Sequence, residues 1–564
     1  MNSLKAVVLA LAFGLLPLPG FAGINEDIVL RADCDGTVHP YNIYVDAAGS
    51  DSRGTGLPGH EFATISKGVS KLGDPSSSNS KVTIRTVCVG NGSYDEEVRI
   101  GPTESGTATE YFMVQATNAA DLANPASISP SSTAVIDGGF LLDGGAQHFA
   151  INGFAITDTV VAGGDGKGQA IRIEGPDDTS GDPLQEFYVI DNYIYSTKGS
   201  GVAIWGADWQ DNPGNFNNLA GIVVRGNYFH NVLDGESNEK LHAAAGVRDI
   251  WFYKNTFVDD RNLDIDSGGE CIDFKDGITD GYIVGNDLTA CGKNDGNGTS
   301  VRRTNIYVDG GRTAWNNAKG FVNQESRCAD KSGATCPVYN NGTPKNPDDD
   351  VLLWTLDAVS FNRNIIISGN RLREGTGNGI SVTTEGFGSN DAISIFNNTV
   401  RNGGAGGIVV FDHRRGKQAY AMCIAARTLC GRTLAVDVYN NTVSGTPQVK
   451  VGQKSFMYNS NHATGVVRAN ISANVTAGIS ADHYQQSGTS SPALSHNVCD
   501  TSSRDATFCA SSETSTTMNL NSELKPASGS AAVNRSGLTV YPAKDIDGVA
   551  RYRGSAPDAG AHEQ

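Results

Sequence analysis

The chain has 564 residues, of which 68 are glycine and 18% are charged, and its formal net charge is −18 at pH 7. So acidic a chain disfavours nucleic acid as a partner, because binding to phosphates requires a basic face. Any polyanionic ligand then needs a locally basic or metal-bridged site. The length alone allows several domains, whereas the composition favours one elongated body.

The first 22 residues have the pattern of a secretory signal. Residues 1–22 read MNSLKAVVLALAFGLLPLPGFA, with one lysine, an apolar run, a Pro/Gly break and the small residue Ala22 before the expected cleavage site. The run is too short and wrongly flanked for a membrane anchor, and no other stretch is long and apolar enough to span a bilayer. We therefore expect a secreted or periplasmic protein without a membrane span, acting as a monomer.

The ten cysteines fit an exported protein, because disulfides persist outside the cytoplasm. None of them has the Cys-x-x-Cys spacing of a zinc or redox site. Sequence cannot prove connectivity, and the simplest arrangement joins neighbours in order. The expected pairs are Cys34/Cys88, Cys271/Cys291, Cys328/Cys336, Cys423/Cys430 and Cys499/Cys509.

Residues 23–80 are expected to form an N-terminal cap. Within them, residues 62–72 (FATISKGVSKL) carry apolar side chains at helical spacing. The residues on that face are Phe62, Ile65, Val69 and Leu72. A short amphipathic helix here would cover the open end of a repeat array, which terminal repeats must do.

Residues 81–485 repeat one pattern: alternating apolar residues, an asparagine, and another apolar pair. The recurring asparagines are Asn192, Asn227, Asn255, Asn286, Asn370, Asn398, Asn441 and Asn470, at spacings of 35, 28 and 31 and then 28, 43 and 29. The alternation indicates a short strand with one buried face. The asparagine fits a tight bend, because its side chain tolerates left-handed backbone and bonds to nearby main chain.

A second recurring strand has the form Gly-x-Gly-Val/Ile-x-Val/Ile, at residues 199–206, 377–383 and 404–412. Two or three short strands per period of about thirty residues, without helices between them, predict an all-β fold: a single-stranded right-handed parallel β-helix. A propeller would show a blade period of about forty residues with its own signature, and a sandwich would not show an asparagine at fixed spacing. We expect residues 315–350 to form a loop insertion and residues 486–564 to form C-terminal coils and a tail.

The stretch GGECIDFKDG, residues 268–277, combines charged and apolar residues in one such strand. Ile272 and Phe274 take the buried positions, so Cys271, Asp273 and Lys275 should point outward. Other coils place Trp205, Thr383 and Phe411 where this coil has Lys275. Glu270 faces outward only if the strand begins with a bend, which the two preceding glycines permit.

Neighbouring coils bring more polar groups to the same flank. Residues 235–242 contain Glu236, Asn238, Glu239, Lys240 and His242, and residues 297–312 contain Arg302, Arg303 and Arg312. Carboxylates, a lysine and arginines together suit β-elimination from a uronic acid polymer. A hard cation neutralises the substrate carboxylate, and a lysine whose pKa is lowered takes the α proton. An arginine stabilises charge or grips the next sugar.

Both ends of the chain resemble secreted β-helix proteins that act on or bind polysaccharides. Residues 41–72 (YNIYVDAAGSDSRGTG…FATISKGVSKL) resemble the start of many such proteins. Residues 545–564 (DIDGVARYRGSAPDAGAHEQ) look like a C-terminal motif common in bacterial right-handed β-helix proteins. The resemblance implies the fold and leaves the reaction to be argued from the site.

Residues 268–277 are similar to the E-x-I-x-x-K segment of β-helix alginate lyases and chondroitinase B, polysaccharide lyase family six. The resemblance implies Glu270 as a Ca²⁺ ligand and Lys275 as the base. The family has a second glutamate where this chain has Gly268, so Asp273 or Asp276 is expected to replace it. Further implied roles are Asn238 or Glu236 as metal ligands and Arg302 as the assisting arginine.

Additional substrate-binding residues are expected beside this site. They are Arg303, Arg312, His242 and Trp205, together with His413 and Arg414 from the cluster FDHRRGK, residues 411–417. That cluster loosely resembles the site of β-helix mannuronan epimerases, but we favour a basic loop over a subsite for acidic sugars or an epimerase-like centre. The predicted function is a calcium-assisted lyase of an acidic polysaccharide such as alginate or pectate. A non-catalytic glycan-binding protein, a uronan C5-epimerase and a glycoside hydrolase remain alternatives.

Overall fold

The computed structural model describes most of the solenoid and parts of the tail. The described residues are 34, 42–73, 84–157 without 109 and 144, 168–175, 184–206, 219–232, 239–259, 269–291, 304–310, 338–339, 351–352, 361–412 without 376, 385–387 and 402–405, 433–445, 454–459, 464–473, 482–486, 492–499, 520–526 without 522, 530, 532, 544–550 without 548, and 558–562. The predicted signal segment lies outside them, as does the predicted insertion except for residues 338–339.

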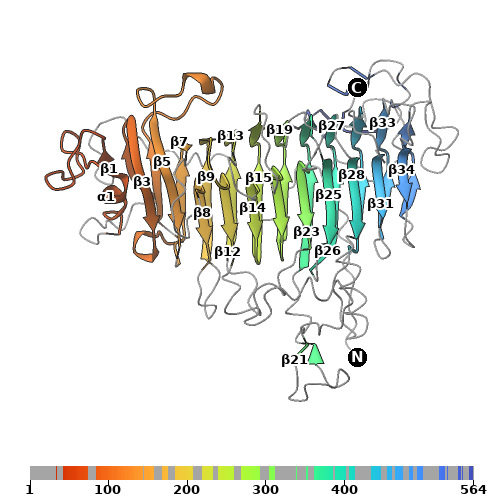
Figure 1. The fold of residues 1–564 in the computed structure, drawn as a ribbon, viewed down its shortest axis with the longest axis horizontal. Coiled ribbons are helices and arrows are strands. Elements are labelled where there is room, and N and C mark those ends of the chain that lie inside the picture. Colours follow the sequence, from red (N-terminus) through yellow and green to blue (C-terminus); the bar gives the residue numbers. More distant parts are fainter. Residues whose placement is uncertain are drawn as a thin grey trace.

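The chain folds as an all-β parallel β-helix whose coils lie side by side along one axis (Figure 1). One coil consists of β9 (Leu184–Ile190), β10 (Tyr193–Tyr195) and β11 (Val202–Trp205). Each of these strands pairs in parallel with the equivalent strand of the next coil. The sequence-based prediction of the fold class is therefore confirmed.

The first strand of each coil belongs to a 13-stranded sheet. Its members are β1 (Asn42–Val45), β2 (Ile84–Val89), β4 (Tyr111–Ala116), β6 (Phe149–Asn152), β9, β12 (Leu219–Arg225), β15 (Val247–Tyr253), β18 (Thr279–Val284), β23 (Phe361–Ser368), β26 (Ser389–Phe396), β29 (Val436–Tyr439), β32 (Val466–Arg468) and β35 (Ala493–Ser495).

The other strands form a 21-stranded sheet that begins with β3 (Gly92–Ile100) and β5 (Ala134–Leu142) and then divides into two ladders. The short-strand ladder contains β7 (Ala155–Thr157), β10, β13 (Tyr228–His230), β16 (Thr256–Val258), β19 (Asp287–Thr289), β24 (Arg371–Arg373), β27 (Thr399–Arg401), β30 (Thr442–Ser444), β33 (Ile471–Ala473) and β36 (Val498–Cys499). The long-strand ladder contains β8 (Ile171–Glu174), β11, β14 (Leu241–Ala244), β17 (Ile272–Lys275), β20 (Ile306–Asp309), β25 (Asn378–Thr384), β28 (Gly406–Asp412), β31 (Lys454–Asn459) and β34 (Asp482–Gln486). A separate antiparallel pair joins β21 (Val338–Tyr339) and β22 (Val351–Leu352).

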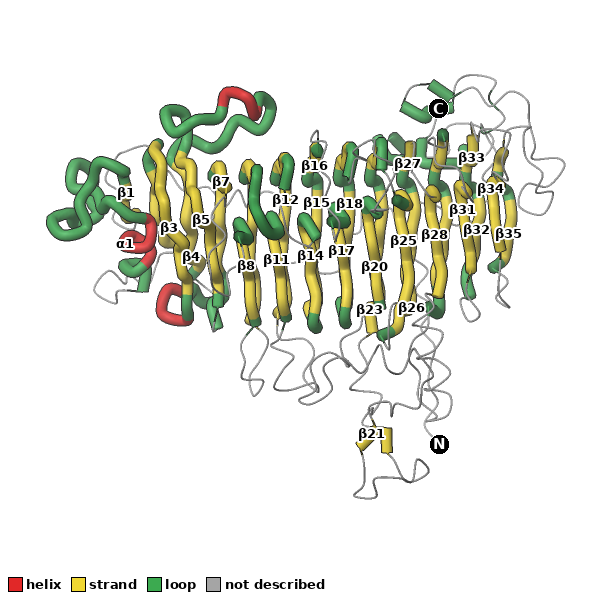
Figure 2. The backbone as a smooth tube through the Cα atoms, viewed as in Figure 1, coloured by secondary structure: helices red, strands yellow, loops and turns green. Residues whose placement is uncertain are grey.

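A short helix, α1 (Ile65–Val69), lies at the N-terminal end of the solenoid (Figure 2). Thr64 caps it, accepting a hydrogen bond from the Lys67 backbone N–H through its side chain. The four apolar residues predicted to share one helical face are all buried and belong to the main core. The predicted capping helix is confirmed. Two 3₁₀ turns, η2 (Pro102–Glu104) and η3 (Pro125–Ser127), interrupt the loops that follow.

A column of buried asparagines runs along the bend between the 13-stranded sheet and the short-strand ladder. Asn227 Nδ2 donates to Asn255 Oδ1 (3.1 Å) and to the Val189 carbonyl (2.9 Å), and the same bonds recur in successive coils. The left-handed residue is the one before each asparagine, such as Lys254 (φ 53°). The prediction that the asparagine itself is left-handed is wrong, and its predicted bonding to main chain is confirmed. The column also includes Asn497.

Two predicted disulfides are present, Cys34–Cys88 and Cys271–Cys291, and Cys499 is also disulfide-bonded. Cys271 lies in the hydrophobic core, so its predicted outward position is wrong: it precedes the first residue of β17, where strict alternation begins. The remaining predicted half-cystines, Cys328, Cys336, Cys423, Cys430 and Cys509, lie outside the described residues. The disulfides fit an extracellular or periplasmic setting. Within the described part of the chain, no helix has the length and apolar character needed to cross a membrane.

Candidate functional site

The predicted site lies on the outer side of the long-strand ladder, where β14 and β17 run side by side. Ile272 and Phe274 belong to the core, so Asp273 and Lys275 point away from it. His242 is the register partner of Asp273 on the preceding coil. A four-residue strand with apolar residues at alternate positions therefore projects a carboxylate and an amine from the solenoid, beside a histidine.

Lys275 joins two carboxylates. Its Nζ lies 2.5 Å from Glu239 Oε1 and 2.7 Å from Asp273 Oδ2. Burial disfavours the ammonium, but Asp273 and Glu239 outweigh it and raise the pKa of Lys275 well above its usual value. Burial also raises the pKa of Asp273. Lys275 acts to lower this pKa, whereas the charges of Glu239 and Glu270 raise it further. For Glu239, burial opposes ionisation, yet Lys275 and His242 lower its pKa to about 2.

His242 lies beneath this ion-pair cluster and is fully buried. Its Nδ1 is 3.6 Å from Glu239 Oε2 and 3.4 Å from Ser200 Oγ, and its ring meets Trp205 edge-on with 5.0 Å between centroids. Burial lowers the pKa of His242 to about 4, although Glu239 acts in the opposite direction. The imidazole is therefore neutral at pH 7, and its Nε2 is buried without a hydrogen-bond partner.

The backbone around Glu270 and Glu239 explains how these side chains reach the site. Gly269 has φ 111°, which confirms the bend expected before Glu270. The Glu270 carbonyl accepts a hydrogen bond from the Lys240 N–H at 2.9 Å. The Lys240 side chain forms a buried ion pair with Asp259, 2.6 Å long, which fixes the segment that carries Glu239.

The predicted column of outward residues is also found. Lys275 pairs in register with Asp309, which pairs with Thr383, and Thr383 pairs with Phe411. Trp205 lies in the same column two coils before Lys275. Glu239 was part of the segment singled out in the sequence but received no role there. Its position three residues before His242 is the signal that relates it to the site.

Several predicted site residues lie outside the described part of the chain. They are Glu236, Asn238, Arg302, Arg303, Arg312, His413 and Arg414. One electrostatic expectation differs from the structure: a base with a lowered pKa was expected, whereas the two carboxylates raise the pKa of Lys275. The cause is the contact of the amine with Asp273 and with Glu239, the second of which no sequence rule placed against the lysine.

The described residues around Lys275 do not fit a calcium ion. Glu239 and Asp273 already share the Lys275 ammonium, and they form no set of three ligand atoms with Glu270. In the described residues, the set that comes together is Asp545, Asp547 and His562 in the tail. Calcium at Glu270 thus stays a prediction that depends on Asn238 and Glu236.

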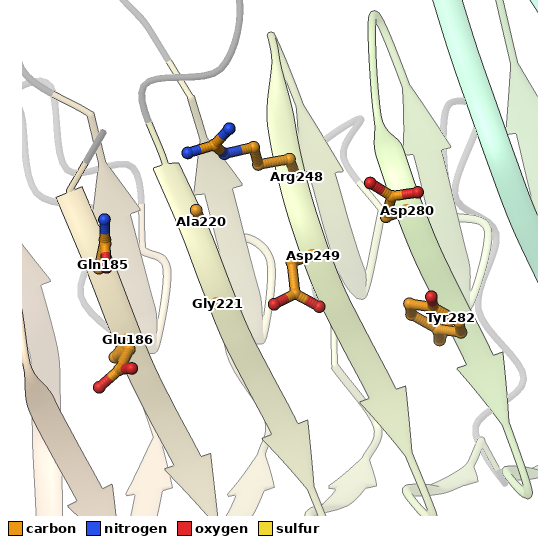
Figure 3. Close-up of a pocket in the computed structure, with 8 residues that line it drawn as sticks. All are labelled: Gln185, Glu186, Ala220, Gly221, Arg248, Asp249, Asp280 and Tyr282. Carbon is orange, nitrogen blue, oxygen red and sulfur yellow. The ribbon is translucent and has the colours of Figure 1, made fainter. Parts of the chain in front are cut away.

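A pocket of about 540 Å³ lies on the outer face of the 13-stranded sheet (Figure 3). We call it the acidic pocket; it is lined by Gln185, Glu186, Ala220, Gly221, Arg248, Asp249, Asp280 and Tyr282. Each strand bends there at a left-handed residue, and Glu186, Gly221, Asp249 and Asp280 occupy that position in successive coils. Burial raises the pKa of Glu186, with Asp249 adding to it. Burial also raises the pKa of Asp249. A hydrogen bond from Trp251 lowers this pKa, whereas the charge of Asp280 raises it further.

Comparisons with known proteins find only distant structural likeness. No protein-family model matches the sequence, and no curated protein matches it either. Solved structures similar to this chain include a complex of XylC with xylose (10% identity, 82% of this chain and 84% of that one, TM-score 0.43). A second is a pectate lyase, with 14% identity over 94% of this chain and 100% of that one and a TM-score of 0.35. A third is a PL6 family polysaccharide lyase from Pseudopedobacter saltans, with 11% identity over 77% of this chain and 91% of that one and a TM-score of 0.37. Likeness at this level carries no argument about the reaction.

Proposed function

We propose that this protein is a secreted polysaccharide lyase that cleaves an acidic, uronic acid-containing glycan by β-elimination at Lys275. One observation carries the proposal: the amine is fixed between carboxylates from two adjacent coils, while the lysine side chain stays partly exposed. The Lys275 side chain is 24% exposed, against 14% for Glu239 and 1% for Asp273. Lys275 is therefore the group of this cluster that a polymer lying across the coils can touch.

The reaction removes the proton α to the substrate carboxylate and expels the glycosidic oxygen from the β carbon. In the proposal, Lys275 Nζ accepts that proton, while Glu239 and Asp273 hold the amine in one direction. Because the two carboxylates raise the lysine pKa, only a small fraction of the amine is neutral near pH 7. Activity is therefore expected to rise with pH into the alkaline range.

Binding of the substrate carboxylate is assigned to the arginines predicted on the following coil, Arg302, Arg303 and Arg312, with Ca²⁺ at Glu270 as a further proposed contributor. The net charge of −18 makes such local positive charge necessary for an acidic substrate.

A glycoside hydrolase is the second candidate, and one observation favours it. Glu239 and Asp273 contact the same ammonium, yet the pKa of Glu239 is lowered and that of Asp273 is raised. Two carboxyl groups with pKa values moved in opposite directions are typical of a base or nucleophile and a general acid. In this alternative, Glu239 is the ionised partner and Asp273 the protonated one.

A panel of uronic acid polymers and neutral glycans separates the two candidates, each assayed with calcium and with chelator. A lyase produces new reducing ends together with the ultraviolet absorbance of an unsaturated sugar, whereas a hydrolase produces reducing ends alone. Lys275→Ala and Lys275→Arg should both abolish lyase activity, because a guanidinium cannot accept the proton. Lys254→Arg, at an exposed lysine of another turn, is the control. Silence across the whole panel contradicts both candidates and favours a glycan-binding protein.

A further inference from the structure

A second pocket, which we call the tail pocket, lies where the C-terminal tail folds back on the short-strand ladder. Its volume is about 460 Å³. It is lined by Asp287, Arg371, Leu372, Arg373, Thr399, Arg401, Glu523, Leu524, Lys525, Asp547 and His562. Hydrogen bonds to the main chain of the tail dock it: Asn397 Nδ2 donates to the Lys544 carbonyl (2.9 Å) and the Gly560 N–H to the Ala469 carbonyl (2.8 Å). The pocket wall therefore belongs to the folded solenoid.

The tail pocket gathers positive charge in a chain that is strongly negative. Arg371 and Arg373 lie on β24, and Arg401 lies on β27 as the register partner of Arg373. Like charges directly opposite each other on neighbouring strands destabilise a sheet. The tail adds Lys525. An anion bound in the pocket would reduce the repulsion between Arg373 and Arg401 and so stabilise this part of the fold.

The arginines keep donors for a ligand. Arg371 Nη2 contacts Asp547 Oδ1 at 2.8 Å, and Arg373 Nη2 contacts Asp287 Oδ2 at 2.6 Å. Each bond uses a single nitrogen of a guanidinium that carries five N–H donors. Both ion pairs are partly exposed, and pairs of that kind contribute little to stability. A ligand carboxylate or sulfate can therefore compete with them, taking up a guanidinium in the bidentate manner that arginine favours.

A metal ion does not fit the same place. Asp545, Asp547 and His562 offer three potential ligand atoms within 4.8 Å of one another. However, Arg371 and Lys525 already contact the two oxygens of Asp547 (2.8 and 2.9 Å). One oxygen of Asp545 accepts two backbone N–H groups. Four lining cations face three lining carboxylates, a local excess of one positive charge, so the pocket suits an anion.

We propose that the tail pocket binds an anionic sugar residue, through its carboxylate or sulfate group, and so forms a second glycan-binding site. The glycan class rests on the proposed function, but the pocket is separate from that site: it lies on the short-strand ladder and the tail, whereas Lys275 lies on the long-strand ladder. A polymer held at one site has a raised effective concentration at the other, provided its length spans both.

The test measures binding to full-length Lys275→Ala protein by calorimetry, so that no substrate is consumed. The probes are oligosaccharides of equal length: a uronate, a sulfated glycan and a neutral glucan. We expect one or both acidic probes to bind and the glucan not to bind. The double variant Arg373→Gln/Arg401→Gln should weaken acidic binding by roughly tenfold or more, the scale of one charge-assisted hydrogen bond.

Two further variants keep the test decisive. Asp287→Asn removes a competing carboxylate and should tighten acidic binding, an effect that a folding defect would not produce. Arg99→Gln removes an exposed arginine with a similar ion pair (2.8 Å to Glu97) and should change nothing. Unchanged affinity in both pocket variants, or equal binding of the glucan, overturns the proposal. Acidic binding that depends on Arg373, together with no cleavage of any uronic acid polymer by the wild-type protein, would overturn the lyase and leave the tail-pocket proposal intact.

Discussion

The Lys275 cluster and the acidic pocket both lie on stacked coils, but only the carboxylates of the Lys275 cluster are in contact with a lysine. In both, the stacking of coils brings carboxylates from successive turns close together. In the first, Lys275 lies between Glu239 and Asp273. In the second, the position between Glu186 and Asp249 is Gly221, which has no side chain. The two sites thus differ in whether a neighbouring position supplies a lysine to the stacked carboxylates or a residue without a side chain.

The pKa values follow from that difference. The pKa of Glu239 falls to about 2 despite its burial, because Lys275 is in contact with it. The pKa of both Glu186 and Asp249 rises, since burial and a neighbouring carboxylate act in the same direction. Figure 3 shows Arg248 reaching over Ala220 and away from Asp249, and its charge lowers the pKa of Asp249 too little to offset burial and Asp280.

Lys275→Met should produce the largest effect, because it converts the first arrangement into the second. Glu239 and Asp273 lose their shared cation, and removing one partner of a mostly buried ion pair costs about 3 kcal/mol. Catalytic activity should disappear as well. Urea unfolding at pH 7 measures the stability change. Adding Asp273→Asn should recover part of the stability and none of the activity, and a fully stable Lys275→Met protein would contradict the role of the ion pairs.

Acid should weaken the Lys275 cluster through His242. Its folded-state pKa is depressed from 6.5 to about 4, so the folded protein binds this proton less readily than the unfolded chain. Stability is therefore present above the unfolded value and is lost as the pH falls from 6.5 towards 4. The difference corresponds to about 3 kcal/mol.

The readout is the free energy of unfolding of wild type and His242→Gln between about pH 4.5 and 7. This window lies above the range in which Glu239 titrates, since its pKa falls from 4.5 to about 2. Asp273 has a raised pKa, so its contribution to stability changes with pH in the opposite direction to that of His242. Because Asp273 is present in both the wild type and His242→Gln, its contribution cancels in the comparison. Equal pH slopes for the two proteins would show that His242 is not the group responsible.

Local sequence patterns predict the scaffold because each coil repeats them. Alternation placed Ile272 and Phe274 in the core and Asp273 and Lys275 outside, and the structure agrees. The asparagine spacing located the bend correctly. The left-handed residue next to Asn192 is Asp191, and no single residue type marks this position, because the equivalent positions of other coils hold glycine, asparagine, lysine, alanine or histidine.

Contacts between coils were harder to predict, because the loops between strands vary in length. Glu239 reaches Lys275 across 36 residues, a separation that alternation cannot translate into a contact. The tail pocket depends on Arg371 and Asp547, which are 176 residues apart. The carboxylates of the acidic pocket stack only because their strands all bend at one left-handed position, which is a property of the assembled sheet.

Gly221→Lys should give the smallest effect and is the inverse of the first experiment, since it places a cation between Glu186 and Asp249. The equivalent residues of other coils carry side chains at the same left-handed φ, so the fold tolerates one at a cost of about 1 kcal/mol. A Cβ there meets the flexible Glu186 side chain at 3.3 Å. Gly221→Ala is the matched control, because it has the same conformational cost of a left-handed φ but adds no charge.

In the wild-type protein, Glu186 and Asp249 have raised pKa values, so the folded state holds their protons more tightly than the unfolded chain does. Their contribution to stability therefore falls as the pH rises from the unfolded values of 4.5 and 3.8 through the folded ones. A lysine at position 221 should lower both pKa values and remove or reverse that slope, while Gly221→Ala should retain it. His148, 3.3 Å from Glu186, titrates with the opposite sign in all three proteins and cancels in the comparison. Equal pH slopes for the lysine and alanine variants would show that a cation beside stacked carboxylates does not control their protonation. They would also contradict the conclusion that contact with Lys275 lowers the pKa of Glu239.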